Sequence, residues 1–243
     1  MVHSIQRKYL KLWWKIKKRA FEKNGWLVNN KIINESGQGA AISFSQSGED
    51  MILRHFLREQ PKGFFVDIGA HHPVRFSNTF HFYLSGWKGI NIDPLPGSMA
   101  LFNKLRPRDI NLEIALGHAG ESVYHIFEEG CYNTFDTEVA KHLVENNISP
   151  LISKKTLKKN RLDEILEKHL SSNAIDLLSI DAEGVDVEIL ETNNWSKFRP
   201  KYICAEAHTT DPNRPMNPCR ILEDNGYHVI ARTGFSVICK SES

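Results

Sequence analysis

The stretch Phe64-Phe65-Val66-Asp67-Ile68-Gly69-Ala70-His71 decides how the rest of the chain is interpreted. An apolar run that breaks at a glycine just before a helical pattern is typical of a buried strand that turns into a helix. In an open α/β sheet, ligands bind at the carboxyl ends of the strands, close to where the strand order reverses. Gly69 would let the backbone approach such a ligand; alternatively, it only permits a positive φ in an ordinary turn.

The next apolar run, Gly89 to Ile92, ends in Asp93. An acidic residue at the end of the second strand can accept hydrogen bonds from both ribose hydroxyls of an adenosine. The sequence contains neither GxGxxG nor GxxxxGK[ST], the glycine patterns that bind the phosphates of dinucleotides and nucleoside triphosphates. The pattern therefore favours a cofactor that has an adenosine but no phosphates, such as S-adenosylmethionine.

Short apolar runs and amphipathic stretches alternate from about residue 62 to the C-terminal end, which predicts a doubly wound, mostly parallel α/β sheet with helices on both faces. The last two runs are separated only by Arg232, Thr233 and Gly234, so we expect a C-terminal antiparallel hairpin. The seven expected strands are Phe64 to Ile68, Gly89 to Ile92, Ile110 to Leu116, Ile175 to Ile180, Tyr202 to Ala205, Tyr227 to Ala231 and Phe235 to Ile238. Helices are expected at about 76–85, 97–106, 161–170, 184–191 and 215–225.

Two of these strands end in groups that can carry chemistry. Asp181 and Glu183 follow Ile180, and Glu206 and His208 end the next strand. We expect His208 to act as the base that deprotonates a hydroxyl, with Asp181 and Glu206 beside it. Asp181, Glu206 and His208 would also suit Mg²⁺ or Mn²⁺. We expect proton transfer without a metal and keep a divalent ion as the alternative.

The order VDIGAH, NIDP, EIALG, LLSIDAEG and ICAEAH resembles the FkbM-type methyltransferases, over roughly residues 43 to 240. The resemblance implies a Rossmann-like, class I methyltransferase fold and S-adenosylmethionine as cofactor. It also implies the following cofactor contacts: Asp67, Gly69 and His71 with the methionine part, Asp93 with the ribose, Ala115 and Leu116 with the adenine edge, Glu49 with the amino-acid end, and Asp181 as a further contact. After Ala70 the family more commonly continues Asn-x-Gly, whereas this chain has His71-His72-Pro73.

Members of this family typically methylate hydroxyls of sugars or polyketides, so the resemblance implies O-methylation of a sugar in a bacterial surface polysaccharide or another glycosylated metabolite. A non-sugar acceptor and a non-catalytic scaffold in a glycan-assembly complex are the alternatives. Tyr132 and Phe135 are expected to stack on the sugar, although an ordinary surface loop fits their sequence equally well. Glu183 is either a substrate contact or a favourable acid at a helix N-terminus.

The 243 residues divide into a basic amphipathic helix at 1–23, a connector at 24–43 and a methyltransferase domain at 44–243. The helix would contact a membrane surface, a glycosyltransferase or its own domain. A net charge of +2 gives no reason to expect nucleic acid as a partner. No secretory signal or membrane-spanning run occurs, so we expect a cytoplasmic protein that can associate with the inner face of the membrane.

Overall fold

The computed structural model describes residues 42–170, 172, 174–207 and 217–242, and residues 43–243 belong to one compact unit. Its main sheet has seven strands in the spatial order β3-β2-β1-β7-β8-β10-β9. The strands are β1 (Phe64–Ile68), β2 (Lys88–Ile92), β3 (Ile110–Leu112), β7 (Leu177–Ile180), β8 (Tyr202–Glu206), β9 (Tyr227–Arg232) and β10 (Ser236–Ser241). The helices of the described residues are α3 (Glu49–Phe56), α4 (Phe80–Leu84), α5 (Met99–Leu105), α6 (Thr137–Glu145), α7 (Leu162–His169), α8 (Asp186–Glu191) and α9 (Pro218–Asp224), with a 3₁₀ turn, η1, at Gly130–Tyr132.

The strand order reverses beside β1, as expected. The chain runs from β1 outward through β2 to β3, then returns to place β7 on the other side of β1. Strand β1 is parallel to both neighbours, pairing Val66 with Ile90 of β2 and with Leu178 of β7. Strand β10 is antiparallel to both β8 and β9. The predicted fold class, a doubly wound and mostly parallel sheet with a C-terminal antiparallel hairpin, is confirmed.

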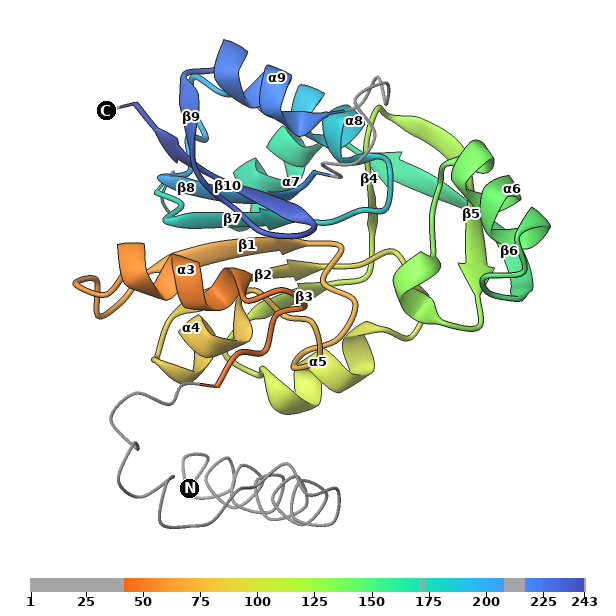
Figure 1. The fold of residues 1–243 in the computed structure, drawn as a ribbon, viewed down its shortest axis with the longest axis horizontal. Helices are drawn as coiled ribbons and strands as arrows, with labels where there is room; N and C mark the ends of the chain where they lie inside the picture. The colour runs from red at the N-terminus through yellow and green to blue at the C-terminus, as the bar shows by residue number, and fades with distance from the viewer. Residues whose placement is uncertain (1–41, 171, 173, 208–216, 243) are drawn as a thin grey trace. The chain divides into compact units, whose positions relative to one another are not determined.

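Helices cover both faces of the sheet because successive residues of β1 point to opposite sides (Figure 1). Phe65 packs in one apolar cluster with side chains of α3 and α4, including Leu53 and Phe80. Val66 and Ile68 lie in the larger cluster on the other face, which includes side chains of α7, α8 and α9. Both faces of β1 are therefore buried, and only its carboxyl end is available to a ligand.

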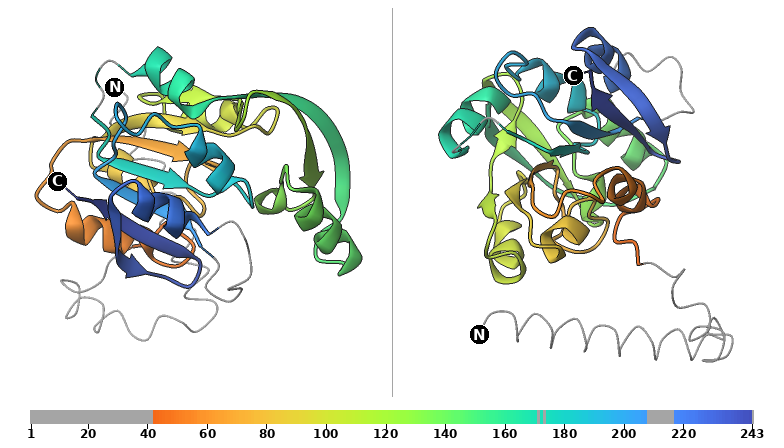
Figure 2. Two further views of the ribbon diagram at one scale, coloured as in Figure 1. Left: turned by 90° about the horizontal axis from the view of Figure 1, so that it is seen from above. Right: turned by 90° about the vertical axis from the view of Figure 1, so that its left-hand side faces the viewer.

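A second, three-stranded sheet was not expected from the sequence. It has the order β4-β6-β5, with β4 at Ala115–Leu116, β5 at Gly120–Phe127 and β6 at Leu151–Asn160. Together with α6, β5 and β6 form an arm that extends away from the main sheet (Figure 2). The expected single strand from Ile110 to Leu116 is wrong, because its first half pairs with β2 and its last two residues pair with β6.

The expected basic helix at 1–23 lies outside the described residues, as does the connector apart from residues 42 and 43. Their predicted boundaries stay predictions. Among the helices that the structure describes, none is long and apolar enough to cross a membrane.

Candidate functional site

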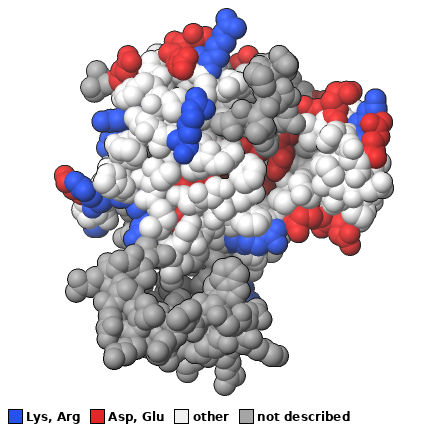
Figure 3. Space-filling view, in the orientation of Figure 1, with Lys and Arg blue, Asp and Glu red and all other residues white. Residues whose placement is uncertain are grey.

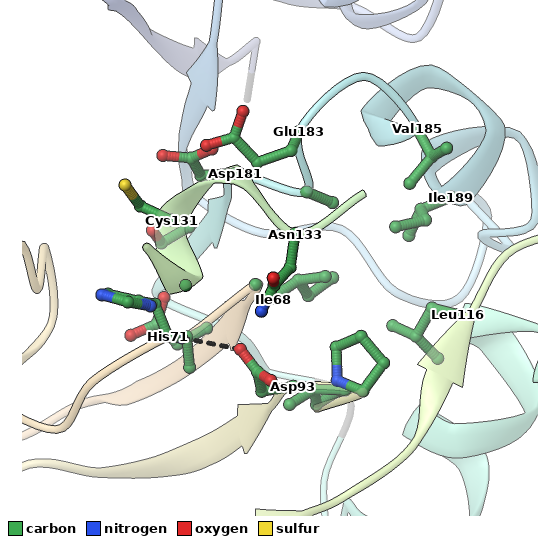
Figure 4. A pocket seen from close by; sticks show the side chains of 18 of the residues that line it. Ile68, His71, Asp93, Leu116, Cys131, Asn133, Asp181, Glu183, Val185 and Ile189 are labelled. Atoms are coloured by element: carbon green, nitrogen blue, oxygen red, sulfur yellow. Dashed lines mark hydrogen bonds between the residues drawn. The ribbon is translucent and has the colours of Figure 1, made fainter. Parts of the chain in front are cut away.

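A pocket opens at the carboxyl ends of β1, β2 and β7, where the strand order reverses. It encloses about 900 Å³ of empty space, including the open solvent at its mouth. The main sheet and the arm both contribute to the walls of the pocket. Tyr124, Asn133 and Phe135 line it from the side of the arm, together with residues at the strand ends of the main sheet. The close-up shows an apolar end around Leu116 and Ile189 and an acidic end at Asp181 and Glu183 (Figure 4).

The floor of the pocket is the loop that follows β1. Gly69 and His71 both have a left-handed backbone, with φ of 70° and 50°. This conformation turns the main-chain N–H of His71 toward Asp93, which follows β2, and the N–H donates to Asp93 Oδ2 at 2.9 Å. The other carboxylate oxygen accepts from Leu95 N at 2.8 Å. Burial raises the pKa of Asp93 despite these two hydrogen bonds, and the fixed carboxylate lines the pocket as expected.

The apolar end lies on the other side of Asp93. Its surface consists of Leu116 of β4, Ile92 of β2, Ile189 of α8 and Val185, the residue just before α8. A flat, uncharged ring is the kind of group that such a surface accommodates. The sequence predicted Leu116 here but not Val185 or Ile189, since apolar residues at helical spacing are usually core residues. Ala115 is buried and does not line the pocket, so the expected contact with the adenine edge falls to Leu116 alone.

Three carboxylates form what we call the acidic wall: Asp181 and Glu183 after β7, and Glu206 at the end of β8. One oxygen of each lies within 4.8 Å of an oxygen of the other two. Burial, and then the nearby charges of Glu206 and Glu183, raise the pKa of Asp181 well above its usual range. Burial and Glu206 likewise raise the pKa of Asp186 to about 7. Acidic side chains are visible in the hollow between the main domain and the arm (Figure 3).

A buried arginine that the sequence analysis missed organises the other side of the floor. Arg106 has no exposed surface and lies 4.0 Å from Asp67. Thr79 connects them, because its hydroxyl accepts from Arg106 Nη1 at 2.8 Å and donates to Asp67 Oδ2 at 2.5 Å. The guanidinium also donates to Pro73 O and Ser77 Oγ, so it fixes the loop from which Ser77 and its neighbours reach the pocket.

The structure brings together most of the residues that the sequence analysis assigned to the site. The lining contains Asp67, Gly69, His71, Asp93, Leu116, Phe135, Asp181 and Glu183, and Glu206 lies beside the last two. His208, the expected base, lies outside the described residues.

Glu49 and Tyr132 lie elsewhere. Glu49 is buried away from the pocket lining, and its carboxylate accepts from Ser47 N at 2.9 Å and from Thr233 Oγ1 at 2.7 Å. It thereby attaches the segment before α3 to the β9–β10 turn, and Gln46 of the same segment lines the pocket. Tyr132 packs against the apolar cluster of Phe127 and Leu143 in the arm and is not part of the lining.

These features fit an adenosine-containing cofactor without phosphates. Asp93 supplies acceptors for ribose hydroxyls, the apolar end suits an adenine ring, and the acidic end suits a positive charge. The family model of the methyltransferase FkbM domain matches residues 67–229, which is more than half of the chain.

The chain belongs to the FkbM methyltransferase family. S-adenosylmethionine is accordingly its cofactor, and Asp93 and the apolar end are the parts of the pocket that could hold its adenosyl half. None of the curated proteins compared with the sequence matches it.

Several solved methyltransferases match the chain at low identity and with TM-scores below 0.5. The 1,6-didemethyltoxoflavin-N1-methyltransferase of Burkholderia thailandensis is 9% identical, with 80% of this chain and 77% of that chain covered and a TM-score of 0.42. The precorrin-6y C5,15-methyltransferase of Geobacter metallireducens is 12% identical, with coverage of 84% and 94% and a TM-score of 0.42. A TehB-like methyltransferase of Corynebacterium glutamicum is 12% identical, with coverage of 93% and 100% and a TM-score of 0.39.

Proposed function

We propose that this methyltransferase acts on oxygen, and that its acceptor is a hydroxyl of a sugar in a polysaccharide or another glycosylated metabolite. The observation that supports this proposal is the acidic wall of Asp181, Glu183 and Glu206 beside the pocket. Carboxylates accept hydrogen bonds from several neighbouring hydroxyls at once, and a sugar presents its hydroxyls in that way. Phe135, which lines the same pocket, supplies an apolar surface for the face of a sugar ring.

The geometry suggests a role for each part of the pocket. Asp93 and the apolar end would hold the adenosyl half, and the acidic wall would hold the acceptor so that its oxygen is in line with the methyl group. When bound, S-adenosylmethionine supplies an electrophilic methyl group whose bond to sulfur breaks as the new carbon–oxygen bond forms. Correct alignment alone can contribute several kcal/mol. The proton of the hydroxyl would pass to a base at these strand ends, and His208 remains our candidate for it.

The place of the enzyme in the cell is also part of the proposal. The basic residues expected on a helix at 1–23 would hold the chain near an anionic membrane surface or near a glycosyltransferase. Such a location, at the inner face of the membrane, would bring the pocket to glycans under assembly. We propose no role for nucleic acid.

Thermal unfolding with S-adenosylhomocysteine tests the cofactor site. Ligand at about 100 times its dissociation constant should add ~2.7 kcal/mol, which raises the Tm of a domain of this size by roughly 5 to 10 °C. Asp93→Ala should abolish the rise. Asp109→Asn is the matched control. Asp109 accepts a hydrogen bond from Gly89 N at the opposite end of β2, so this substitution should leave the rise in Tm intact.

Mass spectrometry of products formed from S-adenosylmethionine then tests the acceptor. A panel of sugars, nucleotide sugars and lipid-linked sugars should give O-methylated products, and amines and carboxylates of similar size should not. Methylation of an amine would refute the sugar proposal while keeping the cofactor site. A chain that binds the cofactor analogue but methylates none of these acceptors would favour the scaffold.

A further inference from the structure

The acidic wall places three carboxyl groups where two strands end side by side. Asp181 follows β7, and Glu206 closes β8, which is parallel to β7. Glu183 joins them through a left-handed backbone with φ of 51°. The carboxylates of Asp181 and Glu183 extend toward the same space in the close-up (Figure 4). The parallel strands β7 and β8 and the turn at Glu183 thus bring oxygens of all three side chains to within 4.8 Å of one another.

Asp181 provides a second, separate observation. Its Oδ1 atom is buried and, within the described part of the chain, has no hydrogen-bond partner. A buried carboxylate oxygen without a partner is costly, and such an atom calls for an explanation by an ion or a water. A bound cation would satisfy this oxygen, and oxygens of Glu183 and Glu206 lie close enough to bind the same ion.

We propose that the acidic wall is a binding site for a divalent cation, with Asp181, Glu183 and Glu206 as its protein ligands. Carboxylate oxygens are the ligands that Mg²⁺, Mn²⁺ and Ca²⁺ prefer. Ligand oxygens at about 2.1 to 2.4 Å from an ion lie ~3 to 4.8 Å from one another in octahedral geometry, and oxygens of the three side chains all lie within 4.8 Å of one another. Three protein ligands leave the remaining positions to water or to hydroxyl oxygens.

This inference revises the expectation of a metal-free site and goes beyond the proposed function, since it concerns a bound ion and not the methylated group. It does not depend on which acceptor is methylated. Because Asp181 and Glu183 line the pocket, the cation would lie next to whatever molecule occupies the acidic end. An acceptor with two adjacent oxygens would then gain a fixed orientation, which an amine would not.

Binding of Mn²⁺ to the full chain, followed by the electron paramagnetic resonance signal of the free ion, tests the site directly. The native chain should bind one Mn²⁺, and Mg²⁺ should compete for the same site. Glu206→Gln and Asp181→Asn should each weaken Mn²⁺ binding at least tenfold. Glu129→Gln is the matched control: Glu129 pairs with Arg75 in an exposed ion pair outside the wall, and Mn²⁺ affinity should be unchanged.

Two further measurements keep a failed variant from being misread. Circular dichroism establishes that each variant is folded, and the Tm shift with S-adenosylhomocysteine establishes that its cofactor pocket is intact. A native chain that shows this shift but leaves millimolar Mn²⁺ free would overturn the cation site and spare the cofactor site. Equal Mn²⁺ affinity in the native chain and in folded Glu206→Gln and Asp181→Asn would overturn it as well. Mn²⁺ binding without the Tm shift would instead count against the cofactor site alone.

Discussion

The main-chain carbonyl oxygen of Asp181 occupies the space beside Gly69 in which any other residue would carry its Cβ atom. An ideal Cβ built on Gly69 would lie 1.7 Å from that oxygen. The carboxyl ends of β1 and β7 therefore touch through their backbones, and this contact sets the spacing between the floor of the pocket and the acidic wall. Gly69 is needed for packing within the protein, whether or not the cofactor is bound.

Gly69→Ala should accordingly be among the most damaging single changes in the domain. Its Cβ collides with fixed backbone, and φ of +70° adds strain, so we expect a loss of about 3 kcal/mol or more in urea unfolding. Gly48→Ala is the control, because Gly48 has a similar φ of +86° but no atom within 4 Å of the place that a Cβ would take. That change should cost only about 1 to 2 kcal/mol. Equal losses in the free energy of unfolding would show that the close approach of Gly69 to Asp181 adds nothing to the cost of the substitution.

The sequence predicts the centre of this fold well because the centre is buried. Strands β1, β7 and β8 are apolar runs broken by acidic residues, so both the strands and the strand-end carboxylates can be recognised. Strand β6 cannot, since most of its side chains, including Lys154 and Lys155, are exposed, and no hydrophobic period marks it. A β-strand of this kind is specified by its partner β5 rather than by its own pattern.

The residues that were misplaced or missed depend on contacts between distant parts of the chain. Glu49 bonds to Thr233, 184 positions away, and no local pattern indicates that pairing. Arg106 stands in Arg106-Pro107-Arg108 at the end of a helix, where a solvent-exposed position is the usual expectation. Only the fold shows that four buried acceptors surround its guanidinium.

Arg106→Met tests that network. It leaves Asp67 buried without its cation and removes the guanidinium from four buried acceptors, so the free energy of unfolding should fall by about 3 to 5 kcal/mol. Adding Asp67→Asn should recover part of the loss, with a coupling of about 1 kcal/mol or more in the double-mutant cycle. Arg108→Met is the control, since Arg108 is partly exposed and stacks on Tyr83 at 3.9 Å; it should cost about 1 kcal/mol or less. A similar cost for both arginines would contradict this account.

Asp109 should make stability depend on pH. Burial raises its pKa to about 6 from 3.8, although Arg106 opposes the shift. The folded protein thus holds this proton more tightly than the unfolded chain, so the contribution is fully present below about pH 4 and is lost as the pH rises through about 6. Between pH 4 and 7 the native chain should lose about 2 kcal/mol more than Asp109→Asn, which carries no charge. Urea unfolding across this range measures the difference, and parallel curves would refute the assignment.

The two aromatic residues expected to stack on a sugar should behave differently, because the arm presents only one of them to the pocket. Phe135 lines the pocket and packs on Tyr124 with ring centroids 4.6 Å apart. Phe135→Leu should raise the KM for the acceptor by roughly tenfold, about 1.4 kcal/mol, and leave the affinity for S-adenosylhomocysteine within about twofold. Tyr132→Leu should change neither quantity and should only lower the Tm, since Tyr132 packs inside the arm. Steady-state kinetics with the methylated sugar, together with calorimetric binding of S-adenosylhomocysteine, separates the two effects; a higher acceptor KM in Tyr132→Leu alone would mean that the arm changes its packing when the acceptor binds.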